Sequence, residues 1–287
     1  MVPKIIEADQ LDRYRQRTFH LLDSLRLKNK EQALQFVEER GFVYFWPIKG
    51  IPYPSLWTAV AGNRKVADAH DDPGHVTWGW KDAMLDKRQW YYAKVLRGKA
   101  TMISLKSVPY FYALSENYGD PEHDYLQLYE DGLLSREAKL IYEALLQHGP
   151  TNTVRIRQVI HMTGKASNSP FDRSMTTLQR DFKILPVGIA EAGAWRYSFI
   201  YDLVHRYYPE LPEKARTIGR REARETLMDL YFSSVGAATV SDVRKIFQWP
   251  PDDVNRALEN MTASGRIGAG YEVEGLQDKH YVIEALN

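Results

Sequence analysis

The chain has 287 residues, of which 44% are hydrophobic and 26% are charged, and its formal net charge at pH 7 is +1. This length and composition allow two or three domains with a buried core, and they argue against long disordered segments. Cysteine is absent, which excludes disulfides, thiolate metal sites and a cysteine nucleophile. The segment Met1–Leu27 carries charges throughout, and no apolar run reaches membrane-spanning length, so we expect a cytoplasmic protein without a signal peptide.

Two helices are predicted near the N-terminus, at Asp9–Arg26 and Asn29–Arg40, with the second ending before a glycine. A stretch rich in proline and aromatic residues follows. After it we expect helices at Ser55–Gly62 and Trp80–Leu96, then a strand or hairpin at Leu96–Leu105. These elements predict an N-terminal domain over residues 1–132, which an elaborated winged helix would explain.

Two later segments begin alike. Arg136–Gly149 ("REAKLIYEALLQHG") and Arg224–Gly236 ("RETLMDLYFSSVG") both have helical spacing of apolar residues and both end in glycine. Each is followed by a threonine and a second short helix, which in the later copy we expect Ser241 to cap.

Each copy continues with a longer third helix, at Phe171–Phe182 and at Asp252–Ser264. A pair of strands then follows in each case. In the first copy the strands are Ile184–Ile189 and Trp195–Ile200, with a wing loop at Ala190–Ala194 between them. In the second copy they are Arg266–Val273 and His280–Ile283, with a wing loop at Glu274–Lys279. Three helices and a hairpin are the order of a winged helix, whose third helix can enter a major groove. We therefore predict a mainly α fold with small β-hairpins (α+β), with tandem winged-helix domains at residues 133–209 and 215–287.

Positive charge gathers in the first copy, where residues 151–183 hold six basic residues and two acidic ones. This local excess favours nucleic-acid contact over a pure scaffolding role. In the second copy the charges of Arg244, Lys245, Arg256 and Arg266 are offset by acidic neighbours. We therefore expect that copy to serve in packing within the protein more than in contact with DNA. The residues expected to contact DNA are Arg155, Arg157, Lys165, Arg173, Arg180, Lys183 and Arg196, with Lys81 and Lys94 upstream.

Aromatic residues concentrate in the N-terminal half, interleaved with lysines and arginines. Such a mixture can stack an unpaired base and hold its phosphate, although filling a core explains most aromatics equally well. We expect Trp57, Trp78 and Trp80 to line a pocket. In an extended segment Trp78 and Trp80 would point the same way.

The stretch Asp68–Trp80 ("DAHDDPGHVTWGW") leads into these tryptophans. Its side chains His70, Asp71, Asp72 and His75 are candidates for a general acid/base pair or for metal ligands. Their spacing matches no metal motif, and no phosphate-binding glycine loop is present, so we expect neither a metal nor a cofactor. A turn at Asp72–Pro73–Gly74, in which side chains cap the backbone, explains the same residues.

The run Trp195–Pro209 ("WRYSFIYDLVHRYYP") resembles the R-x-x-Y-D-L-x-x-R-x-x-P signature of the AlkZ/YcaQ-like tandem winged-helix DNA glycosylases. Ala223–Ile267 is similar to the third module of that family. The matching residues are Tyr201, Asp202, Leu203, Arg206 and Pro209 with Arg196 upstream, then Gly236, Ala238, Thr239 and Asp242 of a G-x-A-T-x-x-D element, and Arg97, Gly98 and Pro109 of an R-G-T-L-H…P element. The resemblance covers most of the chain.

This resemblance implies a C-shaped protein that grips double-stranded DNA and excises alkylated or crosslinked bases. It also implies a catalytic Gln-x-Gln or Gln-x-Asp pair, at positions held here by Tyr44 and Trp46, and a histidine where this chain has Thr101. Tryptophan cannot position and deprotonate a water as a carboxylate can. Any catalysis would therefore use the loop candidates of Asp68–Trp80, whereas Tyr44 and Trp46 are suited to wedge into DNA or stack on a displaced base.

Two other functions fit the sequence. One is a transcription regulator, in which Arg173 and Arg180 contact DNA and the N-terminal aromatic pocket holds a small effector. The other is a protein-interaction scaffold, which the near-neutral net charge favours.

Overall fold

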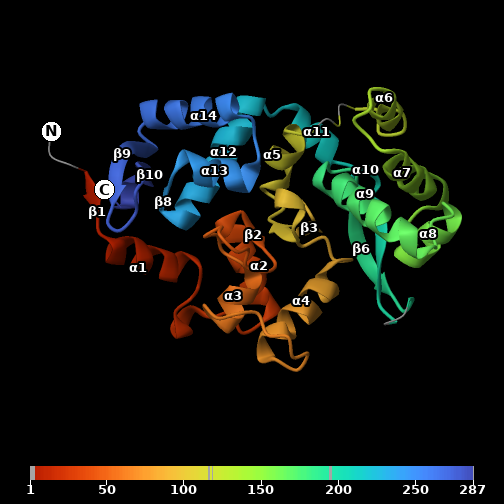
Figure 1. Ribbon diagram of the computed structural model, residues 1–287, viewed down its shortest axis with the longest axis horizontal. Coiled ribbons are helices and arrows are strands. Elements are labelled where there is room, and N and C mark those ends of the chain that lie inside the picture. Colours follow the sequence, from red (N-terminus) through yellow and green to blue (C-terminus); the bar gives the residue numbers. More distant parts are fainter. Residues whose placement is uncertain (1–3, 116, 118, 194–195, 287) are drawn as a thin grey trace. The chain divides into compact units, whose positions relative to one another are not determined.

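A computed structural model describes residues 4–115, 117, 119–193 and 196–286 (Figure 1). Over these residues the chain is mainly helical with small sheets, which confirms the predicted α+β class. None of the helices described is both long and apolar enough to cross a membrane. The chain divides into two compact units: unit 1 consists of residues 1–80, 102–107 and 220–287, and unit 2 of residues 81–101 and 108–219.

Unit 2 is built on a small sheet with three helices beside it. Its elements are β3 (Tyr91–Ala93), α5 (Val108–Ala113), α6 (Asp124–Glu130), α7 (Arg136–His148), β5 (Thr151–Asn152), α8 (Thr153–Val159), α9 (Asn168–Arg180), β6 (Ile184–Ala190), β7 (Ser198–Leu203), α10 (Val204–Tyr207) and α11 (Leu211–Arg216). The strands lie in the order β5-β7-β6, and both pairings are antiparallel. Ser135 and Asn152 cap α7 and α8 by accepting hydrogen bonds from backbone N–H groups of the first turn.

The apolar faces of these elements meet in one core. Ile141 and Leu145 of α7 pack with Leu178 of α9 and with Ile184 and Leu203 of the hairpin. All five side chains are fully buried. Burial of this kind is the main favourable contribution to folding, and it fixes the exposed faces of α8 and α9.

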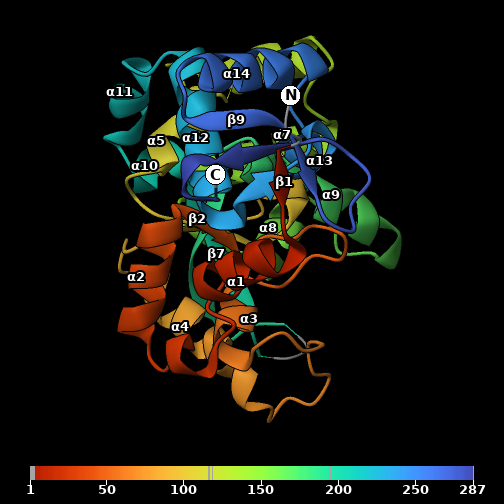
Figure 2. The same cartoon turned by 90° about the vertical axis from the view of Figure 1, so that its left-hand side faces the viewer.

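The C-terminal part of unit 1 repeats the same order of elements. It contains α12 (Arg220–Val235), β8 (Ala237–Ala238), α13 (Val240–Phe247), α14 (Pro251–Ala263), β9 (Ile267–Val273) and β10 (His280–Ile283). Here the strand order is β1-β9-β10-β8, because β1 (Ile5–Ile6) adds to the sheet in parallel with β9 (Figure 2). The two copies thus share the order helix, short strand, helix, helix, hairpin.

The N-terminal part of unit 1 supplies α1 (Ala8–Thr18), α2 (Lys30–Arg40), β2 (Phe42–Tyr44), α3 (Leu56–Ala61) and most of α4 (Val76–Met84), and β4 (Thr101–Ile103) lies beside β2. Gly41 ends α2 at φ +76°, and a Cβ there would lie 2.6 Å from a methyl carbon of Leu230 on α12. Glycine is required because the end of α2 approaches α12 so closely in a left-handed conformation.

From α2 to β4, the chain order of helix, strand, helix, helix and two strands occurs a third time. The expected division into domains 1–132, 133–209 and 215–287 stays a prediction.

Several predicted boundaries are wrong. The first helix ends at Thr18, not Arg26, because His20 adopts φ +56° and breaks the helical path. The helix expected at Trp80–Leu96 begins at Val76 and ends at Met84, and the buried Tyr91 and Ala93 belong to a strand. The predicted strand start at Trp195 and the loop end at Ala194 lie outside the described residues; β7 is described from Ser198.

The cap of α13 is also corrected. Thr239, and not Ser241, accepts the hydrogen bond from the N–H of Asp242, and the Asp242 carboxylate accepts one from the N–H of Thr239. This reciprocal capping box satisfies two N–H groups that the start of a helix leaves free.

Candidate functional site

A cluster of aromatic rings lies around Trp46, immediately after β2. The backbone places it there: the N–H of Trp57 donates to the carbonyl of Phe45, so the loop after β2 folds back on the start of α3. The ring centroid of Trp46 lies 6.2 Å from that of Trp57, 5.8 Å from His75 and 6.2 Å from Trp78. We call Trp46, Trp57, His75 and Trp78 the aromatic cluster.

The cluster has a buried side and an open side. Trp57 is fully buried, whereas 44% of Trp78 is exposed and Trp46 is half-buried. Stacked and edge-to-face arrangements of such rings are favourable, and an exposed indole face offers the same contact to a planar ligand. The open side can therefore hold an unstacked base.

Trp80 does not join the cluster. Trp78 and Trp80 both lie on α4, where two residues are separated by about 200° around the axis, so they face opposite ways. The expectation that they point together is wrong because this segment is a helix and not a strand. Tyr44 is also removed from the open side: it is fully buried on β2 and cannot wedge into DNA in this conformation.

The polar loop beside the cluster is held by Asp72. Its carboxylate accepts two hydrogen bonds from the Arg64 guanidinium, at 2.6 and 3.0 Å, and one from the N–H of Gly74 at 2.7 Å. The Arg64 hydrogen bond, followed by that from Gly74, lowers the pKa of Asp72. The predicted backbone-capping turn at Asp72–Pro73–Gly74 is confirmed, and it leaves this carboxylate ionised and occupied.

Among the residues described, the other loop candidates form no hydrogen bond with one another. A ring nitrogen of His75, Nε2, lies 3.1 Å from the carbonyl oxygen of Ala67, and its ring is edge-on to Trp46 and Trp78. His70 and Asp71 are exposed, and neither side chain is paired with another described residue. Among the residues described, no three His, Asp or Glu side chains lie together as a metal site would need.

The predicted DNA contacts in unit 2 fall into three groups: exposed residues without an ion pair, residues paired with a neighbour, and buried lysines. Arg155 on α8, Arg173 on α9 and Lys165 between them are exposed, and their side chains form no ion pair among the described residues. Lys94, which directly follows β3, places its ammonium 3.5 Å from the Thr176 hydroxyl of α9.

Other basic residues are occupied by partners. Arg180 pairs with Asp181 and Arg196 with Glu191, although both arginines stay exposed. Arg157 stacks 3.8 Å from the ring centre of Phe171 and donates to Asp172.

Two lysines predicted to contact DNA are buried, which corrects the sequence interpretation. Lys183 donates to the side-chain oxygen of Asn117 at 2.8 Å. Lys81 pairs with Asp82 at 2.8 Å, donates to the Tyr197 hydroxyl at 3.0 Å and lies 4.5 Å from the ring centre of Phe199. Burial lowers the pKa of Lys81, and its ammonium is used inside the fold.

We compared the sequence and the structure with those of known proteins. A model of the family described as "AlkZ related" matches residues 27–248. The chain belongs to the AlkZ-related family. Its structure is similar to that of the Streptomyces sahachiroi DNA glycosylase AlkZ, with a TM-score of 0.58 and 12% identity over 96% of this chain and 69% of that one. A search of the curated proteins found no match.

The signature that suggested this family has a structural role here. Arg206 donates to the Asp202 carboxylate at 2.9 Å and to the carbonyl of Leu145, in the last turn of α7, at 3.0 Å. Asp202 in turn accepts from the N–H of Leu203. In this AlkZ-related chain the Asp202–Arg206 pair ties the end of α7 to the hairpin through charge-assisted hydrogen bonds, in which the carboxylate is buried and the guanidinium is partly exposed. The G-x-A-T-x-x-D element likewise forms the capping box of α13.

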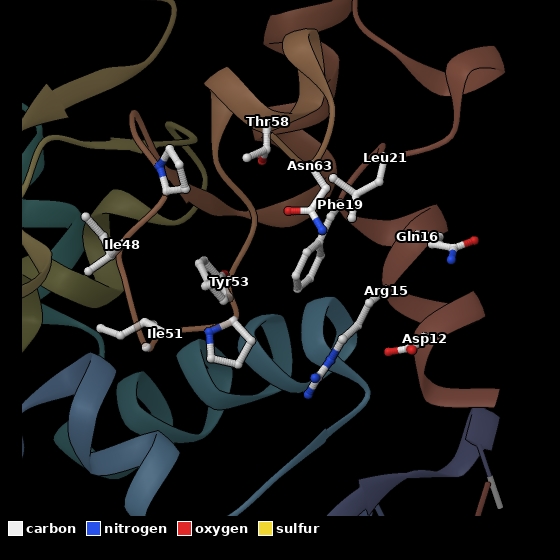
Figure 3. A pocket seen from close by; sticks show the side chains of 13 residues that line it. Asp12, Arg15, Gln16, Phe19, Leu21, Ile48, Ile51, Tyr53, Thr58 and Asn63 are labelled. Atoms are coloured by element: carbon white, nitrogen blue, oxygen red, sulfur yellow. The ribbon is translucent and has the colours of Figure 1, made fainter. Parts of the chain in front are cut away.

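A separate pocket of about 580 Å³ lies in unit 1 and was not predicted from the sequence. Figure 3 shows Asp12, Arg15 and Gln16 of α1 on one side, Ile48 and Ile51 on the other, and the rings of Phe19 and Tyr53 between them. The Arg15 guanidinium donates to the carbonyls of Val235 and Ala237, both at 3.0 Å, and burial lowers its pKa. Its first role is thus to satisfy carbonyls where α12 ends.

Proposed function

We propose that this AlkZ-related chain binds double-stranded DNA, damaged DNA in particular, through tandem winged helices, and holds a displaced base on the aromatic cluster without hydrolysing its glycosidic bond. The exposed face of Trp78 beside Trp46, next to a carboxylate already occupied by Arg64, is the observation that carries the proposal.

The order helix, short strand, helix, helix, hairpin supports the winged-helix assignment. Arg155, Lys165 and Arg173 are exposed on or between the second and third helices of one module, and their charge suits them to neutralise backbone phosphates. The similarity to a DNA glycosylase supports DNA as the partner.

The chemistry of the motif positions supports the proposed absence of hydrolysis. Tyr44 is buried, and the Trp46 indole has no group that can accept a proton from water. Asp72 is held ionised by two donors, so it is a poor acid and its lone pairs are engaged. The site is suited to recognition by stacking.

The test compares duplexes that differ only in one alkylated base, by fluorescence anisotropy and by an assay for released base. We expect tighter binding to the alkylated duplex and no release. Trp78→Ala should remove most of that preference, about ten-fold or more, because stacking of one base contributes about 1–3 kcal/mol. Trp80→Ala is the matched control and should retain the preference.

Base release that Asp72→Ala abolishes would contradict the non-catalytic proposal and make Asp72 the hydrolytic residue. Equal affinity of the wild-type chain for both duplexes would contradict lesion recognition.

The pocket at Arg15 favours a second function, a DNA-binding regulator with a small effector. Its polar side and apolar side suit a small amphipathic molecule. A thermal-shift screen of small carboxylic acids, with Gln16→Ala as the variant, tests this. A ligand that stabilises the wild-type chain more than the variant, and that changes affinity for DNA, would favour the regulator.

A further inference from the structure

A groove between α12 and α14 in unit 1 is lined mainly by arginine. These helices pack against one another, as the labels in Figures 1 and 2 show. The groove has a volume of about 510 Å³, and the charged and amide side chains that line it are Arg220, Arg221, Arg224, Asp253, Arg256 and Asn260. Among the described residues that line the groove, four carry a guanidinium group and one carries a carboxylate.

Internal pairing neutralises only part of this charge. Arg224 pairs with Asp253 at 2.7 Å, and its side chain is 16% exposed. Arg221 is 80% exposed and lies 3.7 Å from Glu225, but that carboxylate also accepts hydrogen bonds from Arg266 and Asn260. Arg256 is exposed, and its side chain has no ion pair within the described part of the chain.

Keeping these charges together is unfavourable in the absence of an anion. Burial lowers the pKa of Arg224, and the charges of Arg220 and Arg256 lower it further. The buried Nε of Arg224 has no hydrogen-bond partner among the residues described. Three of the arginines also lie in the first two turns of α12, where the helix dipole is positive and disfavours cations.

We propose that the α12–α14 groove binds phosphate groups. Guanidinium groups bind phosphate through paired N–H donors, and several around one groove can hold two neighbouring phosphates. The phosphates could belong to the backbone of DNA, in which case the inference rests on the proposed function and adds a second grip distant in sequence from the aromatic cluster. They could equally belong to a free polyphosphate.

The variant that tests the groove is Arg221→Gln/Arg256→Gln, which spares the Arg224–Asp253 pair. Arg13→Gln/Arg17→Gln is the matched control, because both residues are exposed on α1 of the same unit and the same charge is lost. In the DNA arm, the affinity for an undamaged duplex is measured at several salt concentrations. If the groove holds backbone phosphates, the groove variant should reduce the slope of log K against log salt by about 1.8, because each lost contact is worth about 0.9.

In the second arm, inorganic tripolyphosphate is added and thermal unfolding is followed. If the groove binds free polyphosphate, tripolyphosphate should raise the Tm of the wild-type chain and of the control, but not that of the groove variant. A specific loss in either arm supports the site and identifies its ligand. Equal behaviour of groove variant and control in both arms overturns it. If the wild-type chain shows no salt-dependent DNA binding, the proposed function is contradicted. The change in Tm with tripolyphosphate then decides alone whether the groove binds phosphate.

Discussion

The Arg64 guanidinium donates two hydrogen bonds to Asp72, of 2.6 and 3.0 Å, one to each oxygen of the carboxylate. The same guanidinium carbon lies 4.8 Å from the ring centre of Trp57, so one arginine joins the polar loop to the aromatic cluster. The Asp72 carboxylate thus holds the polar loop through Arg64 and the N–H of Gly74.

We predict that Asp72→Asn lowers thermal stability, because it removes the charge that Arg64 binds. Asp71→Asn is the control, since Asp71 is exposed and unpaired among the residues described and its variant should melt like the wild-type chain. Thermal unfolding followed by circular dichroism measures both. Equal melting of the two variants would show that the Arg64 contact contributes nothing.

A second prediction concerns the exposed arginines of unit 2. Arg173→Gln should reduce the dependence of duplex affinity on salt by about 0.9 in the log–log slope, which is the effect of one lost phosphate contact. Arg136→Gln, an exposed residue at the start of α7, should leave the slope unchanged. An identical slope for both variants would exclude the α9 face from the DNA interface.

The buried Lys81 leads to the opposite expectation. Lys81→Met should leave the salt slope unchanged but destabilise the fold by about 1–3 kcal/mol, because Asp82 and the Tyr197 hydroxyl lose their shared partner. Urea unfolding measures the loss. A reduced salt slope with unchanged stability would restore Lys81 to the interface.

The sequence predicted the fold best where local chemistry decides it. The predicted segment Arg136–Gly149 has apolar spacing and a terminal glycine, and the helix runs from Arg136 to His148 with Gly149 as its C-cap. The strand His280–Ile283 is also as predicted, because its pattern of buried and part-buried residues is local. These signals lie within one element, so no distant contact is needed to interpret them.

The candidate site was less accessible from sequence because it depends on distant contacts. Burial of Lys81 requires Tyr197, more than a hundred residues away, and a count of basic residues cannot detect it. The aromatic cluster was partly foreseen in Trp57 and Trp78, but Trp46 became its centre only through the loop that returns to Trp57. The arginines of α12 belong to the sequence "RREAR", which by itself indicates no groove. The groove exists only because residues of α14 form its other side.

Capping of α13 allows a sharp stability test. Thr239→Ala removes one half of the capping box and should cost about 1 kcal/mol, the usual loss for such a cap. Ser241→Ala, two residues later, removes a hydroxyl that has no hydrogen bond within the described residues, so it should be close to neutral. Urea unfolding of both variants distinguishes the observed cap from the one expected from sequence.

One buried and two half-buried histidines predict acid sensitivity below the ordinary histidine range. His280 on β10 is 4% exposed, and burial lowers its pKa; burial also lowers the pKa of His20 and His205. Because the unfolded chain binds protons at a higher pH than the folded chain, the free energy of unfolding should decrease as the pH falls below about 6.5. His280→Gln should make this decrease smaller without removing it, since His20 and His205 remain. Urea unfolding at pH 7.5 and 5.5 measures the difference, and an unchanged pH dependence in the variant would show that His280 is protonated equally in both states.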